Sequence, residues 1–87
     1  MFEPYRTIER FDRNIFNGNG THVTLTVKKR TPLLYYFKTD VVVGMITKTV
    51  KALAYEHYKR GEFIPVEVMV GEKSYCGWVN KKDVVIN

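Results

Sequence analysis

The clearest alternation of apolar and polar residues lies between positions 21 and 29. Val23, Leu25 and Val27 stand two residues apart, with threonine or lysine between and after them. Side chains two residues apart on an extended chain point to the same face, so this period predicts a β-strand with one apolar face. We expect the strand to end in the polar, proline-containing run at 29–32.

A second alternating stretch, residues 62–86, predicts three further strands. Valine recurs at every second position from 66 to 70, which places one apolar face on the first of them. Gly71 then opens a tight turn, because a residue without a Cβ adopts a positive φ at little cost. After this turn we expect a returning strand, one turn of 3₁₀ helix and a short closing strand, at 75–79, 80–83 and 84–86.

Residues 40–58 fit two structures. Apolar residues recur there at helical spacing, and Asp40 could cap a helix. The β-branched run at 41–43 and the glycine at Gly44 both oppose a helix. We therefore favour two strands with a turn at 47–49. In the alternative, one helix over about 40–58 packs on an antiparallel sheet, and the fold is α+β.

The N-terminal region has a helical pattern of apolar residues, with charged side chains between them: Tyr5, Ile8, Phe11 and Ile15. Pro4 suits the first position of a helix, so we expect a short amphipathic helix from about Glu3 to Ile15. Two Asn-Gly pairs at 17–20 then break the pattern. The chain is thus expected to have an N-terminal arm or short helix at 1–20 and one β domain at 21–87.

A resemblance to a known family is carried by residues 61–85, which read GEFIPVEVMVGEKSYCGWVNKKDVV. This stretch resembles the C-terminal half of a bacterial SH3-type domain, in which a strand and a turn precede Gly-Trp-Val, a one-turn helix and a last strand. The resemblance covers about residues 21–87. It implies a mainly β fold, a small five-stranded barrel, with 28–40 as a long first loop. Since such domains are often attached to cell-wall enzymes, it also implies peptidoglycan binding as one function.

Composition favours a partner with a negative surface. The chain has 14 Lys and Arg against 9 Asp and Glu, a formal net charge of +5. It has no apolar N-terminal run, so we expect a cytoplasmic protein without a membrane segment. Its small size without a targeting signal is typical of many viral and mobile-element proteins. Nothing in the sequence specifies an oligomeric state.

No pattern of residues indicates catalysis. The only serine, Ser74, is far in sequence from the two histidines, His22 and His57. The single cysteine, Cys76, excludes an intramolecular disulfide, and its place in a predicted strand favours a buried structural thiol. These residues have no metal-ligand spacing, and there is no glycine-rich phosphate loop. We therefore expect no enzyme activity, no metal and no cofactor.

Basic and aromatic residues are the stronger functional signal. In an SH3-like fold the loops at 28–40, 56–62 and 80–83 would converge on one groove. Cations among exposed aromatic rings suit an acidic protein surface, and they also suit nucleic acid through phosphate contact and base stacking. We expect a non-catalytic binding module, such as an adaptor or inhibitor, with these binding residues: Lys28, Lys29, Arg30, Tyr35, Tyr36, Tyr58, Lys59, Arg60, Lys81 and Lys82.

Two features limit this interpretation. The lysines could be solvated loop residues and the aromatic rings could belong to the core, and Trp78 in particular is expected to serve packing, as the resemblance implies. Phe63 stands where an SH3 domain that reads proline-rich peptides would have a tryptophan. We therefore do not expect proline-rich ligands.

Overall fold

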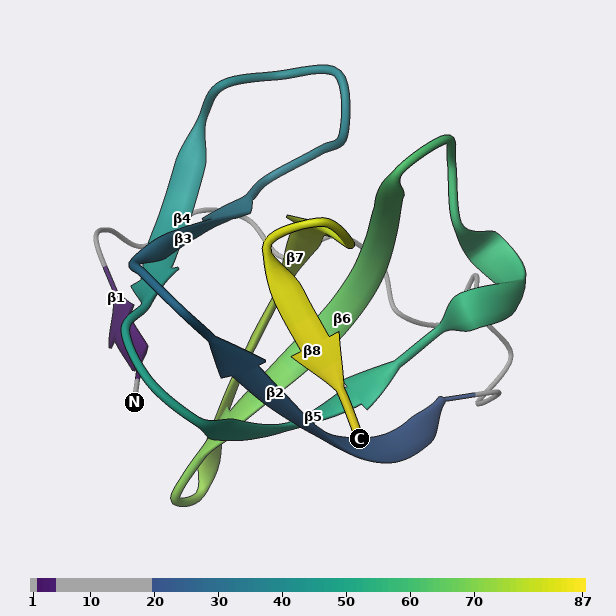
Figure 1. The fold of residues 1–87 in the computed structure, drawn as a ribbon. Helices are drawn as coiled ribbons and strands as arrows, with labels where there is room; N and C mark the ends of the chain where they lie inside the picture. The colour runs from purple at the N-terminus through teal and green to yellow at the C-terminus, as the bar shows by residue number, and fades with distance from the viewer. Residues whose placement is uncertain (1, 5–19) are drawn as a thin grey trace.

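Eight β-strands form one antiparallel sheet in the computed structural model, which describes residues 2–4 and 20–87 (Figure 1). The strands are β1 (Phe2–Pro4), β2 (Thr21–Val27), β3 (Thr31–Leu34), β4 (Val42–Ile46), β5 (Val50–Ala54), β6 (Phe63–Val70), β7 (Lys73–Asn80) and β8 (Val84–Ile86). A 3₁₀ turn, η2 (Glu56–Tyr58), connects β5 to β6. The expected mainly β fold is confirmed.

The strands lie side by side in the order β1-β4-β3-β7-β6-β5-β2-β8. Within the described residues β1 pairs only with β4, and β8 pairs only with β2. The two ends of the sheet are not paired with each other, so the described sheet is open. A closed five-stranded barrel is therefore not confirmed.

The core is formed by the inward faces of the curved sheet. Alternate residues of the central strands are fully buried, including Leu25 on β2, Ala52 on β5, Val66 and Val68 on β6, and Val79 on β7. This is the period of two that the alternating stretches predicted. The inward orientation of Val23, Leu25 and Val27 is confirmed, because the two valines pack against the same cluster.

The outward faces of β6 and β7 are buried as well. Pro65 and Glu67 on β6 lie opposite Trp78 and Cys76 on β7, and all four side chains are buried. Aromatic residues from other segments cover them: Tyr55, for example, donates a hydrogen bond from its hydroxyl to Glu67 Oε1 at 3.2 Å. A hairpin with both faces covered is the centre of the fold, and the expectation of a buried Cys76 is confirmed.

Glu67 corrects a sequence-based expectation. The sequence pattern alone predicts that Glu67, which stands between the valines of the apolar face, lies on the solvated surface, as does Glu62. Glu62 is exposed, whereas Glu67 is only 3% exposed. The alternation placed Glu67 on the outward face correctly, but that face is covered by Tyr55 rather than by water.

The two structures considered for residues 40–58 are now distinguished. The segment forms β4 and β5, as favoured, with a three-residue connection at 47–49 and no α-helix. The α+β alternative is therefore wrong. Gly44 explains part of this outcome, because it lets the ring of Phe2 lie directly against the β4 backbone, where a Cβ would collide with it.

The long first loop expected at 28–40 contains a strand that the pattern did not indicate. Thr31–Leu34 forms β3, which pairs with β4 along its length and with β7 at Leu34 and Trp78. The run has no clean period and contains Pro32, so its local sequence favours neither strand nor helix. Pairing between strands, rather than local propensity, decides this segment.

The expected N-terminal helix is wrong at its start. Residues 2–4 form β1, whose register pairs Phe2 with Ile46 and Pro4 with Gly44. Pro4 is thus an edge-strand residue, where its missing N–H breaks no essential ladder bond. The rest of the expected helix, and the Asn-Gly pairs that follow it, lie outside the described residues.

Turns are close to their expected places. Gly71 has a φ of +62° and forms, with Glu72, the two-residue connection of the β6–β7 hairpin. The segment 80–83 is a hydrogen-bonded turn in which the Asp83 N–H donates to the Asn80 carbonyl at 3.0 Å. That bond has the i to i+3 pattern of a 3₁₀ turn.

Gly77 supplies a test of the contact between β3 and the central hairpin. A Cβ at this position would lie 2.6 Å from both the Leu33 Cγ and the Leu34 carbonyl oxygen. Since a backbone oxygen cannot move without disturbing β3, we expect Gly77→Ala to lower the free energy of unfolding by about 3 kcal/mol in urea denaturation.

Gly71→Ala is the matched control, because a Cβ there meets no atom within 4 Å and only the positive φ opposes it. It should cost about 1 kcal/mol. A Gly77→Ala variant as stable as Gly71→Ala would show that β3 is not closely packed on β7.

Candidate functional site

Three aromatic rings form a cluster on the outward face of the central hairpin. Trp78 is 6% exposed, and the ring centroids of Tyr36 and Phe37 lie 5.9 and 5.0 Å from its own. Tyr36 meets Trp78 edge to face, while Tyr36 itself is 45% exposed. The expectation that Trp78 serves packing is therefore confirmed, and Trp78 supports an aromatic ring that faces solvent.

The exposed side of this cluster borders a shallow pocket. The loop between β3 and β4 contributes Tyr36, Phe37 and Lys38; the segment before and into β6 contributes Arg60, Gly61, Glu62 and Phe63; and Asn80 completes the lining. Figure 1 shows these two segments at the same end of the molecule. We call this the aromatic pocket.

Cations stand beside the aromatic rings. The Lys38 ammonium lies 5.5 Å from the centroid of the Phe37 ring, a cation–π contact. Arg60 is held by its backbone, whose N–H donates to the Phe63 carbonyl at 2.8 Å, and Phe63 returns a bond to the Arg60 carbonyl at 2.9 Å. The aromatic pocket therefore presents an exposed phenol ring and the cations of Lys38 and Arg60, together with the Glu62 carboxylate.

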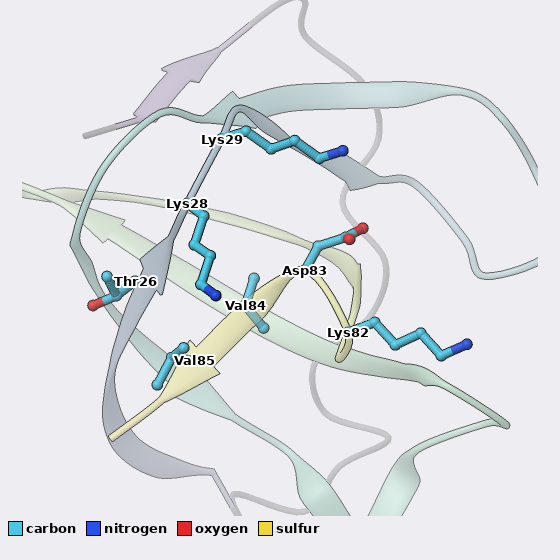
Figure 2. Close-up of a pocket in the computed structure, with 7 residues that line it drawn as sticks. All are labelled: Thr26, Lys28, Lys29, Lys82, Asp83, Val84 and Val85. Carbon is cyan, nitrogen blue, oxygen red and sulfur yellow. The ribbon is translucent and has the colours of Figure 1, made fainter.

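A second pocket, of about 430 Å³, lies on the outer side of β2 and β8 (Figure 2). It is lined by Thr26, Lys28 and Lys29, and by Lys82, Asp83, Val84 and Val85. Figure 2 shows Lys28 extending from β2 toward the valines of β8. Val85 is 48% exposed, so the floor is apolar while the rim carries three ammonium groups and one carboxylate. We call this the lysine pocket.

The turn at 80–83 separates the two pockets. Asn80 lines the aromatic pocket, and Lys82 and Asp83 line the lysine pocket. The turn is tied to the segment before β6, because the Lys81 N–H donates to the Glu62 carbonyl at 2.7 Å and the Lys82 ammonium pairs with the Glu62 carboxylate at 3.0 Å. Both partners of this ion pair are exposed, so it orients Lys82 more than it stabilises the fold.

Five of the ten predicted binding residues line a pocket, and they are divided between two pockets rather than gathered in one groove. Tyr36 and Arg60 line the aromatic pocket, and Lys28, Lys29 and Lys82 line the lysine pocket. The remaining predicted residues line neither of these two: Arg30, Tyr35, Tyr58, Lys59 and Lys81.

Side-chain contacts account for the positions of Arg30 and Tyr35. Arg30 forms an ion pair with Glu3 of β1, with 2.8 Å between Nη2 and Oε1. Tyr35 is half-buried and packs against the hydrophobic core. Arg30 therefore joins the β2–β3 connection to the N-terminal strand, and Tyr35 contributes to packing.

Sequence reasoning missed several lining residues. Lys38 follows the aromatic run directly, and that adjacency was a usable signal. Glu62 and Asn80 enter the site through backbone contacts between distant segments, for which the sequence offers no local signal. Val85 was correctly assigned to a strand, but its exposure depends on which face of β8 is covered.

The residues considered for catalysis lie on different elements and differ in burial. Cys76 is buried in β7, His22 is exposed on β2, and His57 is exposed in η2. Within residues 2–4 and 20–87, no three His, Cys, Asp or Glu side chains are grouped in a way that could hold a metal ion. None of the helical segments in this part of the chain is long and apolar enough to cross a membrane.

Comparisons with known proteins found no match. No family model, no curated protein and no solved structure is similar to the chain at a significant level.

The aromatic cluster predicts a contrast in stability between its buried and exposed rings. Trp78→Ala removes a buried ring and should lower the free energy of unfolding by about 3–5 kcal/mol. Tyr36→Ala removes an exposed ring in edge contact and should cost only about 1 kcal/mol. Urea denaturation followed by circular dichroism measures both without relying on tryptophan fluorescence. Equal losses would mean that Tyr36 is part of the core.

Proposed function

We propose that the chain is a non-catalytic binding module with an SH3-like arrangement of strands. The support is topological: β8, β2, β5, β6 and β7 are consecutive neighbours in the sheet, which is the number of strands that the resemblance to SH3-type domains implies. The β3–β4 hairpin then replaces the simple long loop between the first two of these strands. The tip of this hairpin carries Tyr36 and Phe37 to the aromatic pocket.

The function that the geometry supports best is binding of an acidic protein segment at the aromatic pocket. One observation carries the proposal: Tyr36 is 45% exposed although it rests on the buried Trp78, and Lys38 and Arg60 line the same pocket. A supported aromatic side chain loses little conformational freedom on binding, and the cations attract carboxylates. Tyrosine and arginine are also among the residues that most often contribute a large share of the binding free energy in protein interfaces.

A nucleic acid is the less favoured partner. Nonspecific binding of a single strand uses successive exposed aromatic rings for base stacking along a continuous positive track. Here Phe37 is half-buried and Trp78 is buried, so Tyr36 is the exposed ring of the cluster. Glu62 and Asp83 also interrupt the cations at the two pockets. Peptidoglycan binding is supported by the family resemblance alone.

Charge and aromatic variants test the proposal. Polyglutamate of about 20 residues serves as the acidic probe, and affinity is measured by isothermal titration calorimetry at an ionic strength of about 0.1 M. Tyr36→Ala and Arg60→Glu should each weaken binding roughly tenfold, which corresponds to about 1.4 kcal/mol. Arg60→Glu loses attraction to carboxylates, and Tyr36→Ala loses the supported contact surface.

Lys73→Glu is the matched charge control. It makes the same two-unit change in charge on an exposed residue beside the β6–β7 turn, away from both pockets. Its affinity should stay within about twofold of the unaltered protein, given screening over a Debye length of about 10 Å. Equal losses for Lys73→Glu and Arg60→Glu would mean that net charge alone drives binding. Tighter binding to random-sequence DNA or to purified peptidoglycan than to polyglutamate would contradict an acidic protein segment as the partner and would assign that other polymer instead.

A further inference from the structure

The hydrogen-bonding pattern of β8 directs the backbone groups of one edge away from β2. Thr24 and Asn87 exchange two backbone hydrogen bonds, of 2.8 and 3.0 Å, at the end of the β2–β8 ladder. In an antiparallel pair such doubly bonded residues alternate with residues that do not bond to that partner. Since Thr26 pairs with Val85, the N–H and C=O groups of Val84 and Ile86 point away from β2.

No strand within the described residues pairs with that outer edge. β8 is the last strand in the sheet order, and β2 is its one strand partner there. An edge of this kind presents backbone donors and acceptors at strand spacing, which is the requirement for adding a further strand from another chain.

The surroundings of the edge indicate the chemistry of such a strand. Val85 is 48% exposed and lies in the lysine pocket, which offers an apolar surface beside the edge. Lys28, Lys29 and Lys82 line the same pocket together with the carboxylate of Asp83, and the Lys82 ammonium is also paired with Glu62 (Figure 2). The charge around the edge is therefore positive, and it complements an acidic segment.

We propose that β8 is a docking edge for an extended acidic segment of a partner protein, which adds to the sheet as a further strand. The segment exchanges backbone hydrogen bonds with Val84 and Ile86, places an apolar side chain on Val85, and pairs a carboxylate with Lys28. This inference rests on the proposed function for the class of partner, but it concerns a separate surface on the other side of the 80–83 turn.

Other occupants fit the edge less well. Pairing with β8 of a second copy would bring two chains of net charge +5 together, with the Lys28 and Lys82 side chains of both around one seam. A nucleic acid has no peptide groups to continue the ladder. An acidic extended peptide satisfies both the charge and the backbone requirement.

Ile86→Pro tests the backbone contact directly. Proline removes the outward N–H of Ile86, while the bonds to β2 come from Val85 and Asn87 and should remain. Ile86→Ala is the matched control, because it removes the same partly buried side chain but keeps the N–H. Circular dichroism and urea denaturation confirm that both variants are folded.

The probe is an acetylated nine-residue peptide of alternating glutamate and valine, and its affinity for each variant is measured by calorimetry. Ile86→Ala should bind within about threefold of the unaltered protein, and Ile86→Pro should bind roughly tenfold more weakly than Ile86→Ala. In the unaltered protein, saturating peptide should slow hydrogen exchange at the Val84 and Ile86 amides. Exchange at Val85 and Asn87, already bonded to β2, should change much less.

Equal affinities of the proline and alanine variants, or unprotected Val84 and Ile86 amides at saturation, would overturn the docking edge. If Tyr36→Ala loses binding and the Val84 and Ile86 amides stay unprotected at saturation, the proposed binding at the aromatic pocket is supported and only the docking edge is contradicted. Protection of the same amides without peptide, at rising protein concentration and with a dimer in sedimentation, would assign the edge to a second copy instead.

Discussion

Burial of both faces of the β6–β7 hairpin is the constraint on which the rest of the structure depends. The inward face supplies the centre of the core through Val66, Val68 and Val79, each fully buried. The outward face carries Trp78 and Glu67, which require cover of their own. An indole left in water loses the free energy that burial of its apolar area would contribute. A buried carboxylate is unfavourable unless a hydrogen-bond donor contacts it. Other segments must therefore pack on this face.

That requirement produces the candidate site. Tyr36 and Phe37 cover Trp78, and to reach it the chain must cross from β2 through the β3–β4 hairpin. Close approach at Gly77 allows Leu33 and Leu34 to lie against β7. The loop at the hairpin tip is thus held by packing, and its Lys38 lines the same pocket as Arg60. The contacts that cover Trp78 therefore also form the surface proposed for binding.

The two pockets differ in physical character. The aromatic pocket has a supported ring and cations on ordered backbone, which suits side-chain recognition. The lysine pocket combines an apolar floor with an edge strand, which suits backbone recognition. The Glu62–Lys82 ion pair joins the segments that border them. An extended partner that crosses the 80–83 turn would contact both.

Sequence patterns predicted the strands whose two faces differ. Alternation located β2 and the β6–β7 hairpin, and β-branched residues with Gly44 favoured β4 and β5 over a helix. β3 was not predicted because Thr31–Leu34 has no clear period and contains a proline. Its pairing with β4 and β7 makes it a strand. Glu67 was misplaced because alternation reports which face a residue occupies, not what covers that face.

The candidate site was predictable in composition but not in geometry. The basic and aromatic residue types were identified, and Tyr36, Arg60, Lys28, Lys29 and Lys82 do line pockets. Their division into two surfaces depends on the hydrogen bond from Lys81 to Glu62, which joins residues far apart in the chain. Arg30 forms an ion pair with Glu3 of β1 and lines neither pocket, and no sequence period indicated that strand.

The central claim is that acidic segments are recognised at a defined place on the molecule, and not by net charge spread over its surface. A titration of ¹⁵N-labelled protein with polyglutamate, followed by amide chemical shifts, tests this most directly. The account predicts the largest shifts at residues 36–38, 60–63 and 80. Shifts of equal size at Lys48, Lys51 and Lys73, which line neither the aromatic nor the lysine pocket, would contradict it.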